Sequence, residues 1–298
     1  MKQNWLTIEK KENEVVLTKC SPEAEGEIII PHGVTQIGCH TRMGFDGFYG
    51  CQRITSVIIP QSVIGINGCS FMDCSSLASI HFPEKELRIN GNPFEGTAWY
   101  ENQPDGVVYA GLTAVCYKGA MPKNSEIEIK FGTKAIASGF WGVSVNNSPF
   151  KMSNICSVKI PNTVEYIGIC AFQNCDCLKS INIPNNVKVI ERDTFNRCTS
   201  LSSMIVPEGV EEIKNGAFYG CKNLISIIIS TSIKKIEDHA FFACDNLTSV
   251  KLGMTKPVEI TSTTFTNRFN ATLCVPKGSK AAYEKADFWK EFKEIIEY

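Results

Sequence analysis

The sequence predicts a repeat solenoid, a fold in which short coils of chain stack on one another. One pattern returns every 23 residues, in segments that begin at Ala171, Thr194, Ala217 and Ala240. Several apolar positions keep the same register through these segments, and again over residues 48–94. A single coil of this length cannot bury its apolar side chains alone, whereas stacked coils share a continuous core. We therefore expect about ten such coils along the chain.

A phenylalanine and a cysteine recur in each repeat. The phenylalanines are Phe48, Phe71, Phe94, Phe172, Phe195, Phe218 and Phe241, and the cysteines are Cys51, Cys74, Cys175, Cys198, Cys221 and Cys244. A free cysteine packs like a small apolar side chain, so we expect the phenylalanine rings to stack along one line and the thiols to be buried. Stacked cysteines could also lie close enough for disulfides, although the pattern does not require them.

An alternating I-x-I-P segment follows the cysteine in each repeat. This alternation predicts a short strand with two inward apolar side chains. A proline ends the strand, because it has no backbone N–H to donate. The prolines in this frame are Pro60, Pro83, Pro161, Pro184, Pro207 and Pro276. We expect the strands to form a parallel sheet with a spacing of about 4.8 Å, and the A-F-x-x-C segment to return as a short helical or irregular turn.

The complete repeat resembles that of the BspA-like leucine-rich repeat proteins, whose units read approximately I-x-x-x-A-F-x-x-C-x-x-L-x-x-I-x-I-P-x-x-V-x-x-I. The resemblance covers residues 28–96 and 127–276. The segments "VVLTKCSPEAEGEIIIP" from Val15 and "TLCVPKGSKAAYEKADFWKEFKEIIE" from Thr272 resemble the opening and closing segments of Bacteroidetes members. The resemblance implies an arc of leucine-rich repeats, usually surface-associated, that binds other macromolecules.

Breaks in the pattern divide the chain. We expect an N-terminal β cap over residues 1–30, leucine-rich repeats over 31–96, a degenerate repeat with a hairpin and an insertion over 97–150, leucine-rich repeats over 151–276, and a C-terminal helical cap over 277–298. The ends need cover because a terminal coil exposes its core and strand edge. The hairpin is expected from "VVYAG" and "TAVCYKG". The insertion "GVSVNNSPFKMSN" is either a binding loop or a tolerated surface loop.

The C-terminal cap is expected to be one amphipathic helix. Ser279 is a suitable N-cap residue, and the apolar residues that follow can be placed on one helix face. These residues are Tyr283, Phe288, Trp289, Phe292, Ile295 and Ile296. The helix should cover the last coil, and the alternative is a helix that binds a partner.

Composition and motifs argue against several classes of function. The formal net charge of −1 gives no electrostatic reason to expect nucleic acid or an anionic membrane as a partner. No apolar run is long enough to span a bilayer. The chain has no glycine-rich phosphate loop, no G-x-S-x-G and no H-E-x-x-H. We therefore expect a protein that is not an enzyme.

We also expect no cofactor and no metal. The four histidines (His32, His40, His81 and His239) lie in different repeats with no shared signature. The cluster of Cys170, Cys175 and Cys177 lacks the C-x-x-C spacing of a zinc site. A nucleophilic cysteine would need a nearby histidine and an electropositive setting, and the sequence does not indicate one.

The strand residue between the two inward positions should face solvent, and we predict that this column forms a protein-binding face. Its members are Ile58, His81, Lys159, Asn182, Ile205, Ile228 and Lys251, with Glu128 at the same position in the degenerate repeat. Ile205 and Ile228 are apolar where polar residues are expected, and exposed apolar patches often mark interaction sites. The alternative is that β-branched residues simply favour strands.

A column of serines precedes the first inward residue of each strand. It comprises Ser56, Ser79, Ser157, Ser180, Ser203, Ser226 and Ser249. One interpretation is that the hydroxyls cap backbone groups where the chain enters the strand. The other is a polar track for binding.

The sequence thus predicts a non-catalytic protein-binding module, expected to be a monomer that does not insert into membranes. The resemblance implies an adhesin-like protein at the cell surface or secreted, with a host extracellular matrix protein or another cell's surface protein as partner. The N-terminus lacks the apolar stretch of a secretion signal, so we expect the chain to be either cytoplasmic or a trimmed mature form. The alternatives are an intracellular scaffold, and an enzyme or metal protein that uses residues 97–150 near Trp99, Tyr109 and Trp141.

Overall fold

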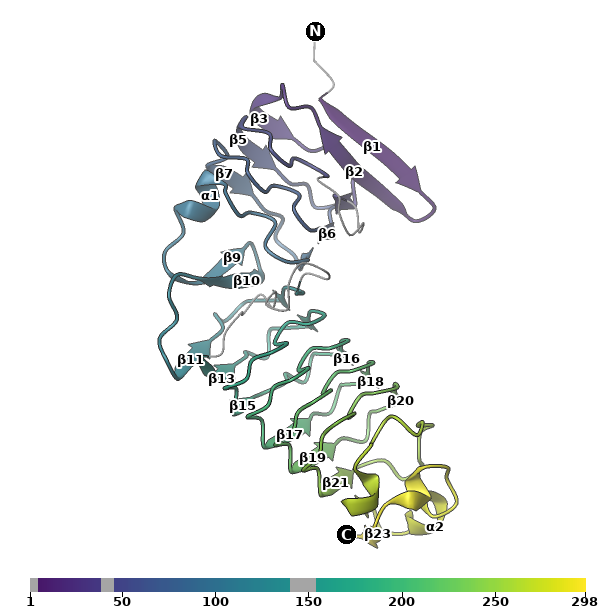
Figure 1. Ribbon diagram of the computed structural model, residues 1–298. Helices are drawn as coiled ribbons and strands as arrows, with labels where there is room; N and C mark the ends of the chain where they lie inside the picture. The colour runs from purple at the N-terminus through teal and green to yellow at the C-terminus, as the bar shows by residue number, and fades with distance from the viewer. Residues whose placement is uncertain (1–4, 39–45, 140–153) are drawn as a thin grey trace. The chain divides into compact units, whose positions relative to one another are not determined.

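The computed structural model describes residues 5–38, 46–139 and 154–298 (Figure 1). The chain divides into two compact units. The N-terminal unit comprises residues 1–120 and 134–149, and the C-terminal unit comprises residues 121–133 and 150–298. Each unit is a stack of coils whose strands form more than one sheet.

The N-terminal unit begins with the expected strands. Its longer-strand sheet is parallel and consists of β3 (Glu25–Ile29), β5 (Arg53–Ile58) and β7 (Ser79–His81). Its second sheet has the order β1 (Leu6–Lys11), β2 (Glu14–Cys20), β4 (Gln36–Ile37), β6 (Gly65–Ile66) and β8 (Arg88–Ile89). The strands β1 and β2 form an antiparallel hairpin at the edge of this sheet.

The hairpin predicted in the degenerate repeat is present. A short helix, α1 (Ala98–Glu101), precedes the antiparallel pair β9 (Gly106–Ala110) and β10 (Thr113–Lys118). The strand β12 (Ala135–Ile136) pairs in parallel with β10. The insertion predicted around residues 142–154 lies almost entirely outside the described residues, as does Trp141.

The C-terminal unit contains the most regular coils. Its longer strands are β11 (Ser125–Glu128), β13 (Ile155–Lys159), β15 (Ser180–Ile181), β17 (Ser203–Val206), β19 (Ser226–Ile229), β21 (Ser249–Leu252), β22 (Thr272–Val275) and β23 (Glu294–Glu297). They form a three-stranded sheet from β11 to β15 and a five-stranded sheet from β17 to β23, all parallel. Residues one repeat apart pair directly, as Ser203 does with Ser226.

A second ladder of two-residue strands was not predicted. In the C-terminal unit it is the parallel sheet of β16 (Val189–Ile190), β18 (Glu212–Ile213) and β20 (Lys235–Ile236), and the two-residue strand β14 (Tyr166–Ile167) comes before them in the chain. The predicted return of the A-F-x-x-C segments as irregular turns is confirmed. Their backbone also bonds from coil to coil, because Phe195 N–H donates to the carbonyl of Ala217 at 2.8 Å.

The phenylalanines stack as predicted. In the C-terminal unit the ring centroids of Phe172 and Phe195 lie 5.8 Å apart, and those of Phe195 and Phe218 lie 5.2 Å apart. Phe241 continues the stack, and the next ring is Phe265, at 4.6 Å from Phe241. These rings are fully buried, so they form the centre of the core.

The cysteines of the repeat are buried, free thiols. The thiols of Cys74, Cys198, Cys221 and Cys244 each donate to the carbonyl of the phenylalanine in the preceding coil, for example Cys221 Sγ to Phe195 O at 3.2 Å and Cys244 Sγ to Phe218 O at 3.1 Å. The same Phe195 carbonyl also accepts from the N–H of Cys198. A small side chain with a weak donor therefore fills this position without leaving a polar atom unsatisfied.

The prediction of a single C-terminal helix is wrong. The segment contains a four-residue helix, α2 (Lys280–Tyr283), a 3-10 turn, η2 (Trp289–Glu291), and the strand β23; another 3-10 turn, η1 (Arg268–Asn270), precedes β22. Phe288 has the left-handed φ of 63°, which a continuous helix excludes. The Trp289 indole N–H donates to Val258 O at 2.8 Å, and Tyr283 Oη donates to Met254 O at 2.9 Å.

Candidate protein-binding face

The predicted binding column lies on the open face of the longer strands. In the five-stranded sheet, backbone pairing places Ile205 beside Ile228 and Ile228 beside Lys251. Pairing then continues to Cys274 and Ile296. The inward neighbours of Ile228, which are Ile227 and Ile229, are fully buried. Strand alternation therefore turns this row toward solvent.

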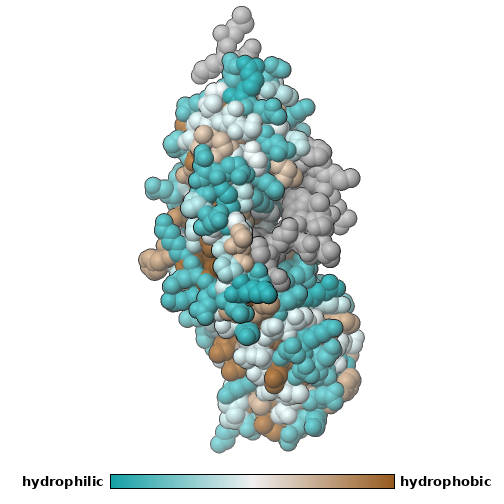
Figure 2. Space-filling view, turned by 60° about the vertical axis from the view of Figure 1, so that its left-hand side comes forward, coloured by the Kyte–Doolittle hydropathy of each residue, from teal (hydrophilic) through white to brown (hydrophobic). Residues whose placement is uncertain are grey.

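The apolar part of this face is well exposed. Ile205 is 62% exposed and Ile228 is 42% exposed. Ile225, just before β19, is 53% exposed. Figure 2 brings forward the side on which β13 to β21 are drawn in Figure 1, and it shows apolar patches within a mostly hydrophilic surface. We call Ile205, Ile225 and Ile228 the isoleucine patch.

Lys251 and Tyr298 border the isoleucine patch. The Lys251 ammonium lies 3.7 Å from the centroid of the Tyr298 ring, a cation–π contact. Tyr298 is held in place because its hydroxyl donates to the Leu252 carbonyl at 3.1 Å. Among the described residues, Lys251 makes no ion pair with a carboxylate. The chain sequence did not indicate this contact, because 47 residues separate its two members.

Two predicted members of the column are engaged within the protein. Lys159 Nζ lies 2.7 Å from Glu128 Oε1 on the neighbouring strand. The Asn182 amide bonds twice to the backbone of Ile160: it accepts from the N–H at 2.8 Å and donates to the carbonyl at 2.7 Å. Because β15 ends at Ile181, this side chain replaces the strand hydrogen bonds there. Asn182 is therefore less suited to a polar contact with a partner.

The N-terminal unit carries its own open strand face. Ile29, Ile58 and His81 are paired across β3, β5 and β7. Ile29 is 64% exposed, whereas Ile58 is half-buried. The sequence prediction missed Ile29, although the segment "GEIIIP" fits the I-x-I-P frame and places Ile29 at its outward position.

The serine column is in register, but its predicted capping role is not supported. Backbone pairing places Ser56 beside Ser79, and Ser203, Ser226 and Ser249 beside one another. Within the part of the chain that the structure describes, these hydroxyls make no hydrogen bond to protein. In the C-terminal unit, Ser203 and Ser226 lie on the same open face as Ile205 and Ile228, because each serine is two residues before the isoleucine of its strand.

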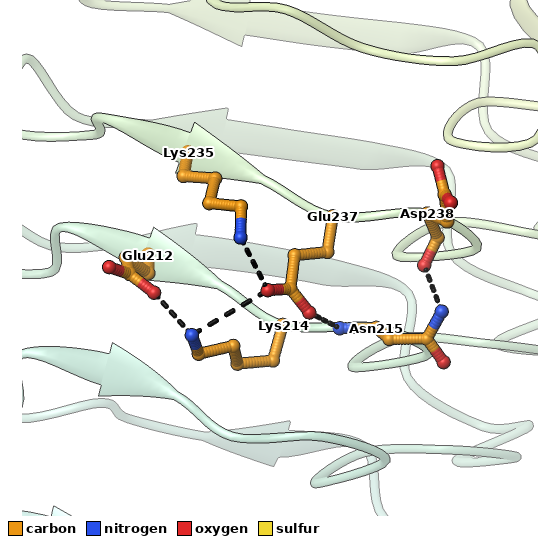
Figure 3. A network of polar contacts seen from close by, with 6 residues as sticks. All are labelled: Glu212, Lys214, Asn215, Lys235, Glu237 and Asp238. Carbon is orange, nitrogen blue, oxygen red and sulfur yellow. Dashed lines mark hydrogen bonds and ion pairs between the residues drawn. The ribbon is translucent and has the colours of Figure 1, made fainter.

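The second ladder of the C-terminal unit presents charges instead. Glu237 lies between two lysines (Figure 3), 2.8 Å from Lys235 Nζ and 3.6 Å from Lys214 Nζ. The backbone N–H of Asn215 also donates to Glu237 at 2.9 Å. Burial acts to raise the pKa of Glu237, but the hydrogen bonds and lysine charges outweigh it and lower the pKa. On this surface the charged side chains pair with one another, whereas the isoleucine patch is apolar and exposed.

The thiols of the core are poorly suited to nucleophilic chemistry. Burial raises the pKa of Cys74, Cys170 and Cys221 to about 12 in each case, so these thiols stay protonated at neutral pH. Within the described ranges, no group of three or more His, Cys, Asp or Glu side chains is placed to hold a metal ion. Likewise, no helix of the described chain has the length and apolar character needed to cross a membrane.

The aromatic residues of the degenerate repeat serve its core. Trp99 packs edge-on against Phe82 and Phe94, with ring centroids 5.5 Å and 4.9 Å away. The Tyr100 hydroxyl lies 3.8 Å from Cys116 Sγ. These aromatic side chains therefore have a packing role.

A family model matches most of the repeats. The model described as "BspA type Leucine rich repeat region" matches residues 41–102 and 143–272 in 6 copies. No curated protein matches the chain.

Several solved structures are similar. The match to the structure of the pneumococcal vaccine antigen PcpA covers 100% of this chain and 98% of the PcpA chain, with a TM-score of 0.54 and 14% sequence identity. The match to a leucine-rich cell surface protein from Faecalibacterium prausnitzii covers 85% of this chain and 94% of that protein's chain, with a TM-score of 0.44 and 18% sequence identity. The match to a leucine-rich repeat protein from Eubacterium ventriosum covers 87% of this chain and 96% of that protein's chain, with a TM-score of 0.37 and 16% sequence identity. At these identities the likeness concerns the fold alone.

Proposed function

This chain belongs to the BspA-type leucine-rich repeat family, and on that premise we propose that it is a non-catalytic protein-binding module that acts at the cell surface or outside the cell. Repeat solenoids present extended surfaces that suit large partners. The resemblance to a family whose members are usually surface-associated supports the adhesin-like role and the location. The open strand face of the C-terminal unit is the surface that we propose binds the partner.

The single observation that carries this proposal is the exposure of Ile205 and Ile228 side by side on that face. A scattered apolar side chain on a surface is ordinary, but Ile205 and Ile228 are adjacent on paired strands, and the exposed Ile225 comes just before β19. Covering one isoleucine side chain by a partner yields about 1.5–3 kcal/mol. Two or three such residues can therefore form the central hot spot of an interface.

The surroundings of the isoleucine patch indicate the chemistry of the partner. The Lys251 ammonium lies on this face, next to the ring of Tyr298. Within the described residues, no carboxylate of this chain pairs with this ammonium. The open serine hydroxyls of β17, β19 and β21 offer hydrogen bonds beside the patch. We propose a protein partner that places apolar side chains on the isoleucines and a carboxylate on Lys251.

One observation favours a second candidate, an intracellular interaction scaffold. All the cysteines in the described parts of the chain are free thiols, and abundant free thiols are typical of reducing compartments. The same strand face would serve both candidates, and only the compartment and the partner differ.

The test compares the full chain with the double variant Ile205→Lys/Ile228→Lys. Binding to a panel of purified extracellular matrix proteins and to intact cells is measured, with unlabelled wild-type chain as competitor. We expect at least a tenfold loss of affinity for a ligand that the wild type binds, because each lost apolar contact costs over about 1.4 kcal/mol. Lys251→Glu should weaken the same binding by charge repulsion.

The matched control is Ile64→Lys/Phe131→Lys, which adds the same charges at other exposed apolar residues, 46% and 81% exposed. The control should bind like the wild type, and all variants should keep the wild-type melting temperature. The strand face is excluded as the binding site if the Ile205→Lys/Ile228→Lys variant, correctly folded, binds every ligand as tightly as the wild type does.

A further inference from the structure

Two buried cysteines converge in the N-terminal unit. Cys20 is the last residue of β2, and Cys51 lies in the first coil that follows. Cys20 Sγ lies 3.7 Å from the carbonyl oxygen of Ser21, and Cys51 Sγ lies 3.5 Å from that same oxygen. The backbones are also joined here, because the N–H of Cys20 donates to Gly47 O. The two sulfurs therefore meet at one acceptor.

This arrangement differs from that of the other repeat cysteines. Cys74 donates to Phe48 O at 2.9 Å, and Cys198 donates to Phe172 O at 3.2 Å, so each of these thiols has its own carbonyl. Cys51 has no such phenylalanine carbonyl below it, because β2 of the terminal hairpin occupies the place of the preceding coil. Its thiol turns instead toward the end of β2, where Cys20 lies.

We propose that Cys20 and Cys51 form a disulfide that fastens the β1–β2 hairpin to the first coil. The oxidant is a low-molecular-weight disulfide of the glutathione or cystine class. The thiolate of one cysteine attacks a sulfur of the oxidant, which forms a mixed disulfide and releases one small thiolate. The other cysteine, as thiolate, then attacks the mixed disulfide and releases the second small thiolate. The two protein thiols lose two electrons and two protons, and the oxidant becomes two thiols.

The surroundings favour Cys51 as the attacking group. The hydrogen bond from the Cys20 thiol lowers the pKa of Cys51, against the opposing effect of burial. The same contact, together with burial, raises the pKa of Cys20, which suits the second step once Cys51 is no longer ionised. Both residues are almost fully buried, at 3% and 1% exposure. The oxidant must therefore act during folding or when the terminal hairpin opens.

The cross-link would close a loop that contains residues 21–50. Disulfides that close loops of this size stabilise a protein mainly by restricting the unfolded chain. The end of a stack is also the part that opens most readily, so a bond at this position opposes fraying. The inference does not depend on the proposed binding function, and it concerns the other unit.

The test refolds the full chain in a buffer of oxidised and reduced glutathione, followed by alkylation of the remaining thiols and peptide mapping by mass spectrometry. We expect a cross-linked peptide pair that contains Cys20 and Cys51 and lacks two hydrogen atoms. Oxidised protein should melt at least about 5 °C above reduced protein. The Cys51→Ser variant should lose both the peptide and the shift, whereas Cys74→Ser, the matched control, should retain both.

The wild-type peptide map decides the matter even where a variant folds poorly. The inference is overturned if the map shows only free Cys20 and Cys51, or if these residues are joined mainly to other cysteines such as Cys39 or Cys69. A redox-dependent melting shift that persists in Cys51→Ser would also contradict it.

Discussion

The ring of Phe218 lies flat on that of Phe241, with centroids 5.2 Å apart and planes within 4° of parallel, although 23 residues separate them. Phe195 and Phe265 extend this stack on either side. Each ring is thus covered by the coil before it and the coil after it. The stability of one coil therefore depends on its neighbours, as expected of a solenoid.

We predict that Phe218→Ala destabilises the protein by about 3–5 kcal/mol, because it removes a fully buried ring and leaves a cavity between two others. Urea unfolding followed by circular dichroism measures the loss. Phe131→Ala, the same substitution at an 81% exposed ring, should cost less than about 0.5 kcal/mol. Equal effects of the two substitutions would contradict the stacked core.

The core columns could be predicted from the sequence because a large apolar residue that recurs at a fixed spacing is typical of stacked coils. The second ladder could not. Its strands β16, β18 and β20 are two residues long and bury one well-packed residue each, namely Ile190, Ile213 and Ile236. So short an element has no alternation from which to recognise a strand.

In the C-terminal cap, a clear helical pattern in the sequence predicted the wrong element. The apolar spacing of Tyr283, Trp289 and Phe292 fits a helix face, but these side chains pack on one another and on Phe265 from separate turns. Ile295 and Ile296 then alternate as buried and exposed in β23. The contacts that decide between helix and strand are made with residues far away in the chain, so local periodicity does not contain them.

For the candidate site, the exposed row could be predicted but its contacts could not. Strand alternation alone places Ile205 and Ile228 on the open face. The pairing of Lys251 with Tyr298, and that of Asn182 with the Ile160 backbone, depend on side-chain positions that no repeat column encodes. That this face binds a protein stays a prediction.

The buried thiols predict a loss of stability at alkaline pH. The pKa of Cys74, Cys170 and Cys221 is raised from 9.0 to about 12. Above about pH 9 the unfolded chain releases these protons while the folded chain keeps them. The resulting stability is fully present below this pH and falls as pH rises toward 12, by up to about 1.4 kcal/mol per pH unit for each thiol.

Urea midpoints at pH values from about 8 to 11 measure this dependence. Cys221→Ala should show a shallower fall than the wild type, because one of the ionising groups is gone. Cys156→Ala, at a partly exposed thiol outside the repeat column, should fall as the wild type does. A wild-type midpoint that stays constant across this range would refute the assignment.

Glu237 predicts a dependence at acid pH. Although burial opposes it, the contacts with Lys235, Asn215 and Lys214 lower its pKa from 4.5. Its contribution is therefore present above pH 4.5 and is lost as pH falls through the lowered value. We expect Glu237→Gln to destabilise the protein at neutral pH by about 0.5–1 kcal/mol, the range for partly exposed ion pairs.

The measurement is the urea midpoint of Glu237→Gln and of the wild type at about pH 7 and about pH 3, and the difference between the two proteins should be smaller at the lower pH. Added salt at neutral pH should reduce it as well. Glu259→Gln alters an exposed carboxylate of the same unit and should change neither midpoint. A difference that is the same at both pH values would mean that Glu237 contributes through packing and not through its charge.

The backbone at Ala243 predicts a stabilising substitution. Ala243 has φ = 54°, a left-handed conformation that costs a residue with a Cβ about 1–2 kcal/mol relative to glycine. In the preceding coil the equivalent position is Gly220, with φ = 69°. Glycine also gives the unfolded chain more conformational entropy, which offsets part of this gain. Ala243→Gly should therefore stabilise the protein by a net of about 0.5–1 kcal/mol.

Thermal unfolding of Ala243→Gly measures the gain, and Gly216→Ala provides the converse. Gly216 has φ = 66°, and a Cβ at this position would lie 2.4 Å from Asp193 Oδ1, so the variant should melt below the wild type. Ala282→Gly, at an exposed position inside α2, controls for the substitution itself and should destabilise, because glycine weakens a helix. A lower melting temperature for Ala243→Gly would show that the alanine methyl group contributes more by packing than its backbone conformation costs.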